Sequence, residues 1–208
     1  KKHYHHKNVC NLSQIKKKED NILIEGNQSL ALGALAAGLN FYAGYPMTPS
    51  SSILHYLVKV AEKTNIVVKH AEDEIAVINM ALGASHVGAR AMIGTSGGGF
   101  SLMTESLGLN SITETPLVIV NVQRPGPATG LPTWVEQGDL QFVLRAAQGD
   151  FPRIVLAPGD VKESFEFGHT AMNLAEIYQM PVIILSDKLI GEGNKVVKKF
   201  STKGIKIN

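Results

Sequence analysis

The stretch PLVIVNV, at Pro116–Val122, decides the fold. It is a continuous apolar run rich in β-branched residues, which is typical of a strand buried on both faces of a parallel sheet. Five further apolar runs predict strands, and they alternate with helical patterns. The expected strands are Asn40–Ala43, Ile66–Lys69, Arg90–Gly94, Pro116–Val122, Arg153–Leu156 and Pro181–Leu185, and the expected helices are Gln28–Gly38, Ser50–Lys63, Glu72–Val87, Phe100–Leu109 and Val161–Tyr178. This order predicts an α/β fold, a doubly wound parallel six-stranded sheet with helices on both faces.

Length and composition predict one globular domain. The chain has 208 residues, of which 44% are hydrophobic and 18% are charged, and these values are ordinary for such a domain. We expect residues 21–190 to form it. Residues 1–20 hold six lysines and are expected to be a basic tail or linker. Residues 191–208 turn polar and basic, and we expect a linker towards a missing or separate domain.

Charge, hydropathy and cysteine content narrow the classes of function. The net charge of +2 is concentrated in residues 1–20, so the remainder offers no basic surface for nucleic acid. No apolar run reaches the roughly 20 residues of a membrane span, and no signal peptide is visible. The single cysteine, Cys10, points to a reducing, cytoplasmic location. A solvated tail or a tag remnant explains His3, His5 and His6 better than a metal site does, so we expect no metal on this chain.

Ligands of doubly wound sheets bind beyond the carboxyl ends of the strands, so the residues after each strand are the candidates for function. After the first expected strand comes GYPMTPSS, at Gly44–Ser51. Thr48 is a good N-cap, and Pro49 suits the first helical position. The same helix start, with its hydroxyl groups, is also suited to hold an anion or a carboxylate. A capping role and a binding role both stay open for Thr48.

The second strand leads into HAEDEIAVINMALGA, at His70–Ala84. This helix has almost no polar face, which predicts a buried helix. Favourable interaction with the helix dipole explains Glu72 and Asp73. Glu74 falls on one stripe with Val77, Ile78, Ala81 and Leu82. A buried carboxylate is costly unless it is paired, so a structural role and a functional role are both open for Glu74.

The third strand is followed by GTSGGGFSLMTE, at Gly94–Glu105, whose glycines allow a close backbone approach. A dinucleotide fingerprint fails because Leu102 stands in place of the last glycine. The nucleophile-elbow pattern G-x-S-x-G does match around Ser96, which makes a serine hydrolase the sharpest rival hypothesis. Its base would have to be His169, the only later histidine, which lies in the middle of an expected helix. We therefore rank the hydrolase well behind.

The fourth strand is followed by QRPGPATGLPTWVEQGDL, at Gln123–Leu140. Its prolines and glycines predict a long irregular loop, and such loops are usually functional or disordered. Arg124 lies at the strand end, where its guanidinium group could bind a carboxylate through paired hydrogen bonds. Thr48, Glu74, the glycine run and Arg124 all fall on one rim of the predicted sheet, which indicates a single site.

These stretches carry a family resemblance. From about Gly26 to Gly193 the chain resembles the pyrimidine-binding domain of thiamine-diphosphate enzymes. More narrowly, it resembles the α subunit of 2-oxoacid:ferredoxin oxidoreductases, particularly the 2-oxoglutarate type. The stretches that carry it are GYPMTPSS, EDEIAVINMALGAS, GARAMIGTSGGGFSLMTESLG and VNVQRPGPATGLPTWVEQGDL.

The resemblance implies roles for single residues. Glu74 matches the catalytic glutamate that hydrogen-bonds the aminopyrimidine ring and activates the cofactor. Thr48, Arg124 and Thr133 are implied to bind the substrate. Tyr45, Pro46, Ser96, Gly97, Gly98 and Gly99 are implied to lie close to the cofactor, together with Glu74. Relatives often carry proline in place of Gly98 and isoleucine in place of Met47.

The resemblance also implies partners and an activity. The implied reaction is oxidative decarboxylation of a 2-oxoacid, 2-oxoglutarate foremost, to acyl-CoA with reduction of ferredoxin. Nothing in the chain resembles the family's segment for Mg²⁺ and the diphosphate, so a β subunit is expected to carry Mg²⁺, the diphosphate-binding domain and the iron–sulfur cluster. Coenzyme A, ferredoxin and a heterodimer or heterotetramer are likewise implied. The alternatives are a pyruvate or branched-chain thiamine-diphosphate enzyme, the hydrolase, and a non-catalytic α/β interaction module.

Overall fold

The computed structural model describes residues 20–208, which form a six-stranded parallel sheet with a small second sheet beside it. The order of strands across the large sheet is β3 (Val67–His70), β2 (Phe41–Gly44), β4 (Ala91–Thr95), β5 (Leu117–Gln123), β7 (Pro181–Asp187) and β6 (Ile154–Leu156). All neighbouring pairs are parallel. The predicted fold class is confirmed, and the predicted strand ends differ from the observed ones by at most two residues.

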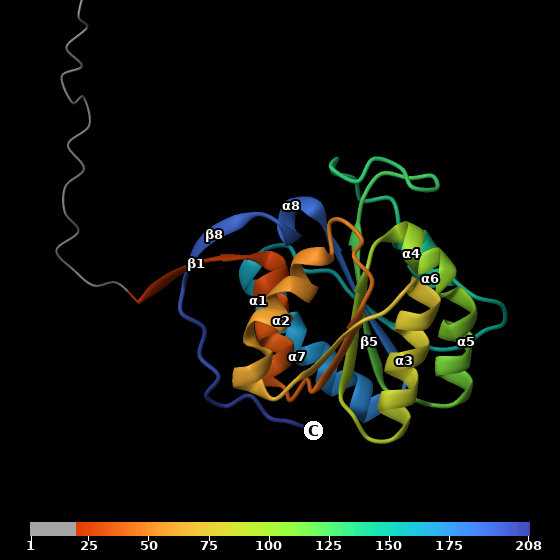
Figure 1. Ribbon diagram of the computed structural model, residues 1–208, viewed down its shortest axis with the longest axis horizontal. Coiled ribbons are helices and arrows are strands. Elements are labelled where there is room, and N and C mark those ends of the chain that lie inside the picture. Colours follow the sequence, from red (N-terminus) through yellow and green to blue (C-terminus); the bar gives the residue numbers. More distant parts are fainter. Residues whose placement is uncertain (1–19) are drawn as a thin grey trace, which may run out of the picture.

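Helices cover both faces of this sheet (Figure 1). One face carries α1 (Gly26–Ala36), α2 (Ser51–Thr64) and α7 (Val161–Tyr178), and the other carries α3 (Glu74–His86), α4 (Gly97–Leu102), α5 (Thr104–Ile112) and α6 (Leu140–Arg145). Side-chain alternation along β5 produces the two layers. Val118, Val120 and Val122 pack towards the first set of helices, whereas Leu117 and Ile119 pack towards the second. Every residue of β5 is buried, as the PLVIVNV pattern predicts.

A direction change in the strand order locates the ligand-binding edge. From β2 the chain crosses to β3 at one side, and it then returns to place β4 on the other side of β2. The carboxyl ends of β2 and β4 therefore flank the switch point of the sheet, where ligands of such folds bind. Gly44 and Gly94 are paired there.

The small sheet is a two-stranded antiparallel ribbon that the sequence patterns do not predict. It joins β1 (Asn21–Glu25) to β8 (Asn194–Lys198), and α8 (Lys188–Gly191) lies between β7 and β8. Residues 191–208, expected as a linker, therefore include a regular strand. The strand was missed because NKVVK is short and largely exposed, and because its partner lies at the other end of the domain. What this segment leads to stays a prediction.

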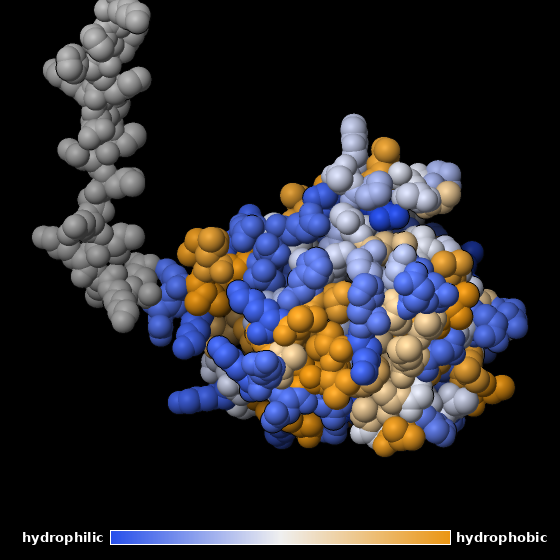
Figure 2. Space-filling view, in the orientation of Figure 1, coloured by the Kyte–Doolittle hydropathy of each residue, from blue (hydrophilic) through white to orange (hydrophobic). Residues whose placement is uncertain are grey.

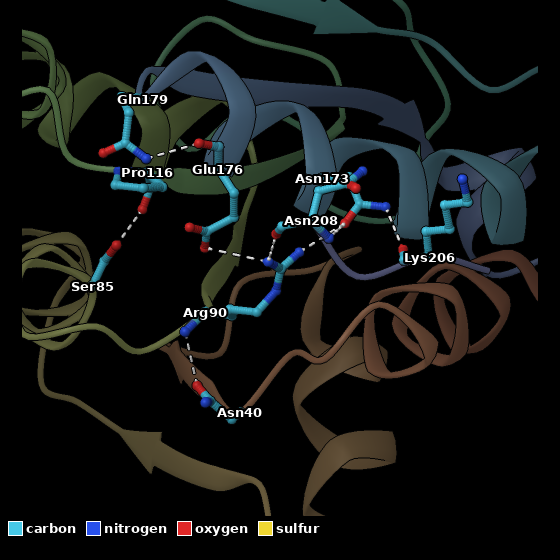
Figure 3. Close-up of polar contacts among 9 residues, drawn as sticks. All are labelled: Asn40, Ser85, Arg90, Pro116, Asn173, Glu176, Gln179, Lys206 and Asn208. Atoms are coloured by element: carbon cyan, nitrogen blue, oxygen red, sulfur yellow. Dashed lines mark hydrogen bonds and ion pairs between the residues drawn. The ribbon is translucent and has the colours of Figure 1, made fainter.

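A polar network around Arg90 holds the amino ends of the strands (Figure 3). The Arg90 guanidinium donates to Asn173 Oδ1 on α7 at 3.0 Å and to the main-chain oxygen of Asn208 at 2.6 Å, and it lies 3.8 Å from Glu176 Oε1. Burial lowers the pKa of Arg90, and the charge of Glu176 partly offsets this effect. Asn173 Nδ2 also donates to the Lys206 oxygen at 2.8 Å. The network attaches the C-terminal segment to α7 and to the start of β4.

Aromatic contacts attach the same segment further along α7. The rings of Phe200 and Phe165 are stacked with centroids 4.3 Å apart, and the ring of His169 meets Phe165 edge-on at 5.8 Å. Burial lowers the pKa of His169, and the charge of Glu166 acts in the opposite direction. The C-terminal segment thus packs along α7 by apolar contacts as well as polar ones.

Two findings concern membranes and metals. Between residues 20 and 208, no helix combines the length and apolar character needed to span a bilayer. Over the same residues, no group of three His, Cys, Asp or Glu side chains is arranged to hold a metal ion. Cys10 and the three N-terminal histidines lie outside the described part of the chain, as does most of the expected basic tail.

Candidate active site

Glu74 is the first residue of α3, and its carboxyl group lies inside the protein. Asp73 caps the helix: it has φ +82°, and its carboxylate accepts the backbone N–H of Ala76 at 2.8 Å. Glu74 is only 3% exposed, and its Oε1 has no hydrogen-bond partner among residues 20–208. Glu72 is exposed and precedes the helix, so the predicted helix start is two residues too early. The three neighbouring acids therefore differ in role, and only Glu74 is buried.

The sides of α3 differ in burial, although its sequence is apolar all round. The predicted stripe is buried, and it comprises Glu74, Val77, Ile78, Ala81 and Leu82. On the other side Ile75 is 49% exposed and Met80 is 47% exposed. The expectation of a helix buried all round is thus wrong, because the sheet, α4 and α5 together cover only part of the circumference of α3. An exposed apolar surface lies directly beside the buried acid.

The glycines after β4 form the first turn of a helix. The sequence predicts a glycine-rich loop with a helix from about Phe100, but α4 already begins at Gly97, and α5 follows as a separate helix. Ser96 occupies the N-cap position in an extended conformation without a side-chain capping bond. Its hydroxyl is buried and has no partner among the described residues. The turn thus leaves a polar atom free at the carboxyl end of β4.

Gly99 brings the α4 turn into close contact with Glu74. A Cβ atom at Gly99 would lie 2.8 Å from Glu74 Oε1 and 2.1 Å from Thr95 Oγ1, so only glycine fits without rearrangement. The backbone N–H of Gly99 donates to the sulfur of Met47 at 3.3 Å. A thioether is a weak acceptor, but here it satisfies one of the free N–H groups at a helix start. β2, β4 and α3 meet at this point.

The connection from β2 to α2 forms a turn rather than the predicted cap. α2 begins at Ser51, and residues 48–50 form a turn in which Ser50 Oγ donates to the Met47 oxygen at 2.7 Å. The Thr48–Pro49 peptide bond is cis. Since α2 begins at Ser51 and Ser50 is its N-cap, Thr48 is not the N-cap, and Pro49 is not the first helical residue. The carbonyl oxygen of Thr48 instead points towards the end of β5, which lies beyond β4 in the sheet.

Arg124 reaches that carbonyl from the end of β5. Arg124 is 8% exposed, and its Nη1 donates to the main-chain oxygen of Thr48 at 2.7 Å. Its Nε has no partner within the described chain. Burial lowers the pKa of Arg124, and the charge of Glu74 partly offsets this. The two side chains are thus close enough to interact, although no ion pair within 4.0 Å joins them in residues 20–208. Arg124 retains hydrogen-bonding capacity for a ligand.

A cavity of about 460 Å³ opens between the α4 turn and the loop after β5. Its lining includes Met47, Gly97, Gly98, Arg124, Asp139 and Phe142, together with Gly126–Thr129 of the loop. Three of the residues that the sequence assigns to cofactor or substrate thus line the cavity, namely Gly97, Gly98 and the cation Arg124.

The remaining predicted site residues lie at different distances from this centre. Tyr45 is half-buried, with its ring centroid 6.3 Å from that of His70, and Pro46 is exposed. Thr133 is exposed on the loop and does not line the cavity. The roles of Tyr45, Pro46 and Thr133 stay predictions, whereas Gly99 lies against Glu74, and the charge of Glu74 acts on Arg124.

Asp139 is a polar residue of the cavity that sequence reasoning missed. It directly precedes α6, where an aspartate usually acts as an N-cap, but its side chain makes no capping bond. Instead it accepts a hydrogen bond from Asn121 Nδ2 on β5 at 3.0 Å. Burial raises the pKa of Asp139, and this hydrogen bond opposes the rise. The available signal was its place at the end of the long Pro/Gly-rich loop.

The geometry does not favour the serine hydrolase. Ser96 is fully buried, and its hydroxyl contacts no base among the described residues. His169 lies on α7 against Phe165, in the layer of helices opposite to α4. Ser96 also lacks the strained backbone of a nucleophile elbow, since its φ of −130° and ψ of 176° are ordinary extended values.

Comparison with known proteins agrees with this site. Residues 32–207 match the family model described as pyruvate flavodoxin/ferredoxin oxidoreductase, thiamine diphosphate-binding. The 2-oxoglutarate synthase subunit KorA of Archaeoglobus fulgidus is 48% identical over 169 residues, which are 81% of this chain and 49% of that protein. The 2-oxoacid:ferredoxin oxidoreductase subunit alpha of Saccharolobus solfataricus is 45% identical over 203 residues, 92% of this chain and 32% of that subunit.

A solved structure is similar as well. The 2-oxoglutarate:ferredoxin oxidoreductase of Magnetococcus marinus, with 2-oxoglutarate, coenzyme A and succinyl-CoA bound, superposes with a TM-score of 0.88 at 41% identity. The match covers 91% of this chain and 33% of that one. The chain thus spans between a third and a half of the length of these relatives. Because the family model covers most of its residues, the chain belongs to the pyruvate flavodoxin/ferredoxin oxidoreductase family, in which it corresponds to the thiamine diphosphate-binding domain.

Proposed function

We propose that this chain supplies the pyrimidine side of a thiamine diphosphate site in a 2-oxoacid:ferredoxin oxidoreductase. The observation that carries the proposal is Glu74 Oε1, a buried carboxyl oxygen without a partner in the described chain. A buried polar atom is costly to leave unpaired, so its persistence indicates that a ligand supplies the missing hydrogen bond. A ring nitrogen of an aminopyrimidine is a suitable partner for it.

The residues present fit this cofactor. Glu74 would hold the ring nitrogen, and the α4 turn presents Gly98 to the cavity, where the nearest atom to a Cβ position is the Ala128 oxygen at 3.5 Å. The cavity of about 460 Å³ beside that turn is within the size range of small-molecule sites. When bound, thiamine diphosphate supplies the nucleophilic carbon and the electron sink for decarboxylation, whereas the protein orients and tunes it.

Arg124 is the residue we assign to the carboxylate of the 2-oxoacid. It lies across the cavity from the α4 turn with an unpaired Nε, and a guanidinium binds a carboxylate in fixed geometry. The main chain of Thr48 holds Arg124 from one side, and the Thr48 hydroxyl is assigned to the same substrate end. Thr133 is exposed in this chain, so its assignment to the substrate requires the loop to fold inwards in the assembled enzyme.

The exposed side of α3 supports a partner subunit at this site. Ile75, next to Glu74, is half exposed, and so is Leu102 at the cavity wall. Figure 2 shows apolar residues over the middle of the face in front of α2 and α3. Exposed apolar patches of this kind mark interaction surfaces. We assign a β subunit with the diphosphate-binding domain, Mg²⁺ and an iron–sulfur cluster to it, in a cytoplasmic heterodimer or heterotetramer.

The proposed reaction converts 2-oxoglutarate, coenzyme A and oxidised ferredoxin to succinyl-CoA, carbon dioxide and reduced ferredoxin. The choice of 2-oxoglutarate rests on the relatives, which include 2-oxoglutarate synthase subunits and a structure that holds 2-oxoglutarate and succinyl-CoA. Pyruvate and branched-chain 2-oxoacids are the alternatives within the same chemistry.

The test is to purify the chain with its β subunit and to measure 2-oxoacid-dependent reduction of a viologen dye. We expect turnover that requires thiamine diphosphate and coenzyme A, with 2-oxoglutarate preferred over pyruvate. If the complex prefers pyruvate, the proposed substrate is wrong, but the proposed enzyme class stands. A complex that binds thiamine diphosphate neither before nor after addition of 2-oxoacid would overturn the proposal in favour of a non-catalytic interaction module.

A further inference from the structure

The connection from Arg124 to Asp139 forms one wall of the cavity while standing largely in solvent. Figure 1 shows it as the green loop that rises above α4 and α6. Residues Gly126–Thr129 line the cavity, and a backbone hydrogen bond from Leu131 to Pro125 stabilises the middle of the loop. An exposed loop of this length keeps one shape only if its two ends are held. Arg124 holds the first end through the Thr48 oxygen.

Asp139 holds the second end against β5. Its backbone N–H donates to Gln123 Oε1 at 2.9 Å, and its carboxylate Oδ2 accepts from Asn121 Nδ2 at 3.0 Å. Asn121 and Gln123 are two residues apart on one strand, so both side chains leave the same face. Gln123 Nε2 continues the network to the Ser186 oxygen on β7 at 3.2 Å. The loop end is therefore fastened to the central strands by side chains rather than by sheet hydrogen bonds.

The same carboxylate touches the α4 turn. A Cβ atom at Gly97 would lie 2.7 Å from Asp139 Oδ2 and 3.1 Å from Oδ1, so the carboxylate lies against the backbone of the first helical residue. Asp139 thus bridges the two walls of the cavity, the loop on one side and the glycine turn on the other. Burial raises its pKa, as expected for a carboxyl group withdrawn from water.

We propose that Asp139 is a positioning residue that fastens the 125–138 loop to β5 and sets its spacing from Gly97. In this role it keeps Arg124 and the α4 turn in the arrangement that the cofactor and substrate require. The positioning role rests on the proposed function, whereas the fastening of the loop does not.

The fastening is tested on the full chain alone by limited proteolysis with mass-spectrometric mapping of cuts within residues 125–138. We expect Asp139→Ala to be cut at least about tenfold faster than wild type, since a hydrogen bond to a charged group is worth a factor of about ten or more. Asp139→Asn keeps an acceptor oxygen for Asn121 and should restore most of the protection. The matched control is Asp150→Ala, an exposed aspartate without a hydrogen bond or ion pair in residues 20–208. Equal cutting of Asp139→Ala and wild type would overturn the proposal.

The positioning role is tested in the complex with the β subunit. We expect Asp139→Ala to raise the apparent thiamine diphosphate constant and the substrate KM about tenfold or more, with a smaller fall in kcat, and Asn121→Ala to act non-additively with it. If Asp139→Ala is cut faster in the loop but keeps the wild-type thiamine diphosphate constant and substrate KM, the positioning role is overturned. A wild-type complex that binds no thiamine diphosphate would overturn the proposed function and this role with it, while the proteolysis would still report on the fastening.

Discussion

The half-buried Arg90 and the buried Arg124 lie at opposite ends of neighbouring strands, and they differ in how the protein uses them. Arg90 precedes β4 and Arg124 follows β5. Burial lowers the pKa of both, and a glutamate partly offsets this in each case, Glu176 for Arg90 and Glu74 for Arg124. Both terminal nitrogens of Arg90 bind side-chain or main-chain oxygens of the protein, whereas Arg124 makes one hydrogen bond, to the Thr48 oxygen.

The same contrast holds for the two edges of the sheet. At the amino edge two buried atoms, Arg90 Nε and Asn110 Oδ1, are unpaired within the described residues. Asn173, Glu176 and the C-terminal main chain take up the remaining capacity of Arg90. At the carboxyl edge, buried unpaired atoms gather, namely Glu74 Oε1, Ser96 Oγ, Asn121 Oδ1 and Arg124 Nε. The amino edge thus uses its polar groups for stability, whereas the carboxyl edge retains polar groups for a ligand.

Glu74→Ala should have the largest effect at the carboxyl edge. We expect turnover in the complex to fall about 10²–10⁴-fold, the usual range for loss of a group that assists proton transfer, with little change in Tm because an unpaired carboxyl group is removed. The measurement is 2-oxoacid-dependent viologen reduction beside a thermal melt, with exposed Glu72→Ala as the control. Near wild-type turnover in Glu74→Ala would show that the buried acid is structural.

Arg90→Ala should produce the opposite result. Its removal leaves Asn173, Glu176 and main-chain acceptors without their donor, so we expect a loss of about 2–4 kcal/mol in the free energy of unfolding. Denaturant unfolding measures the loss, and turnover per folded molecule should not change. Lys162→Ala, which removes an exposed i,i+4 pair with Glu166, is the control and should cost less than about 0.5 kcal/mol. Equal losses in the two variants would contradict the structural assignment of the amino edge.

Arg124→Ala should affect binding more than folding. We expect the substrate KM to rise about 10–100-fold, because a charge-assisted contact to a carboxylate is lost. The Tm should fall less than in Arg90→Ala, because only the hydrogen bond to the Thr48 oxygen is lost. Arg124→Lys should recover little of the loss, since an ammonium group lacks the planar pair of donors. Steady-state kinetics on the complex give both constants, and an unchanged KM would remove Arg124 from the site.

The smallest expected effect concerns His169 on α7. Its pKa in the folded chain is lowered, so between that value and the ordinary pKa of about 6.5 the unfolded chain binds more protons. Stability therefore rises as pH rises through this window and falls on acidification. Solvent screening limits the effect to a fraction of a kcal/mol. Urea unfolding at about pH 5 and about pH 8 should show a pH dependence in wild type that His169→Gln reduces; a steeper dependence in the variant would contradict it.

Local patterns were sufficient to predict the large sheet. Each of its strands is an apolar run between helices, so PLVIVNV and the other strand segments can each be recognised from a few residues of sequence. The β1–β8 ribbon could not be predicted in this way, because it depends on a pairing between the two ends of the domain. The start of α4 was misplaced because three glycines in a row have a low helix propensity, which tertiary packing against Glu74 overrides.

The site was predictable where one residue carries the signal. Glu74 stands out as an acid on an apolar stripe, and Arg124 as a cation at a strand end. Asp139 could not be found in this way, because its partners Asn121 and Gln123 belong to a strand that reads as ordinary core. Of the two roles left open for Thr48, the capping role is wrong, since residues 48–50 form a turn that hydrogen bonds from Ser50 to the Met47 oxygen hold.

The three glycines of the α4 turn differ in how much substitution each can accept. A methyl group at position 99 would overlap Thr95 and Glu74, and one at position 97 would press on Asp139, but one at position 98 would meet nothing nearer than the Ala128 oxygen at 3.5 Å. Homologues can therefore diverge at the middle position while the outer two stay constrained. Gly99→Ala would also displace the Glu74 carboxyl group by steric contact, without changing any charge in the protein.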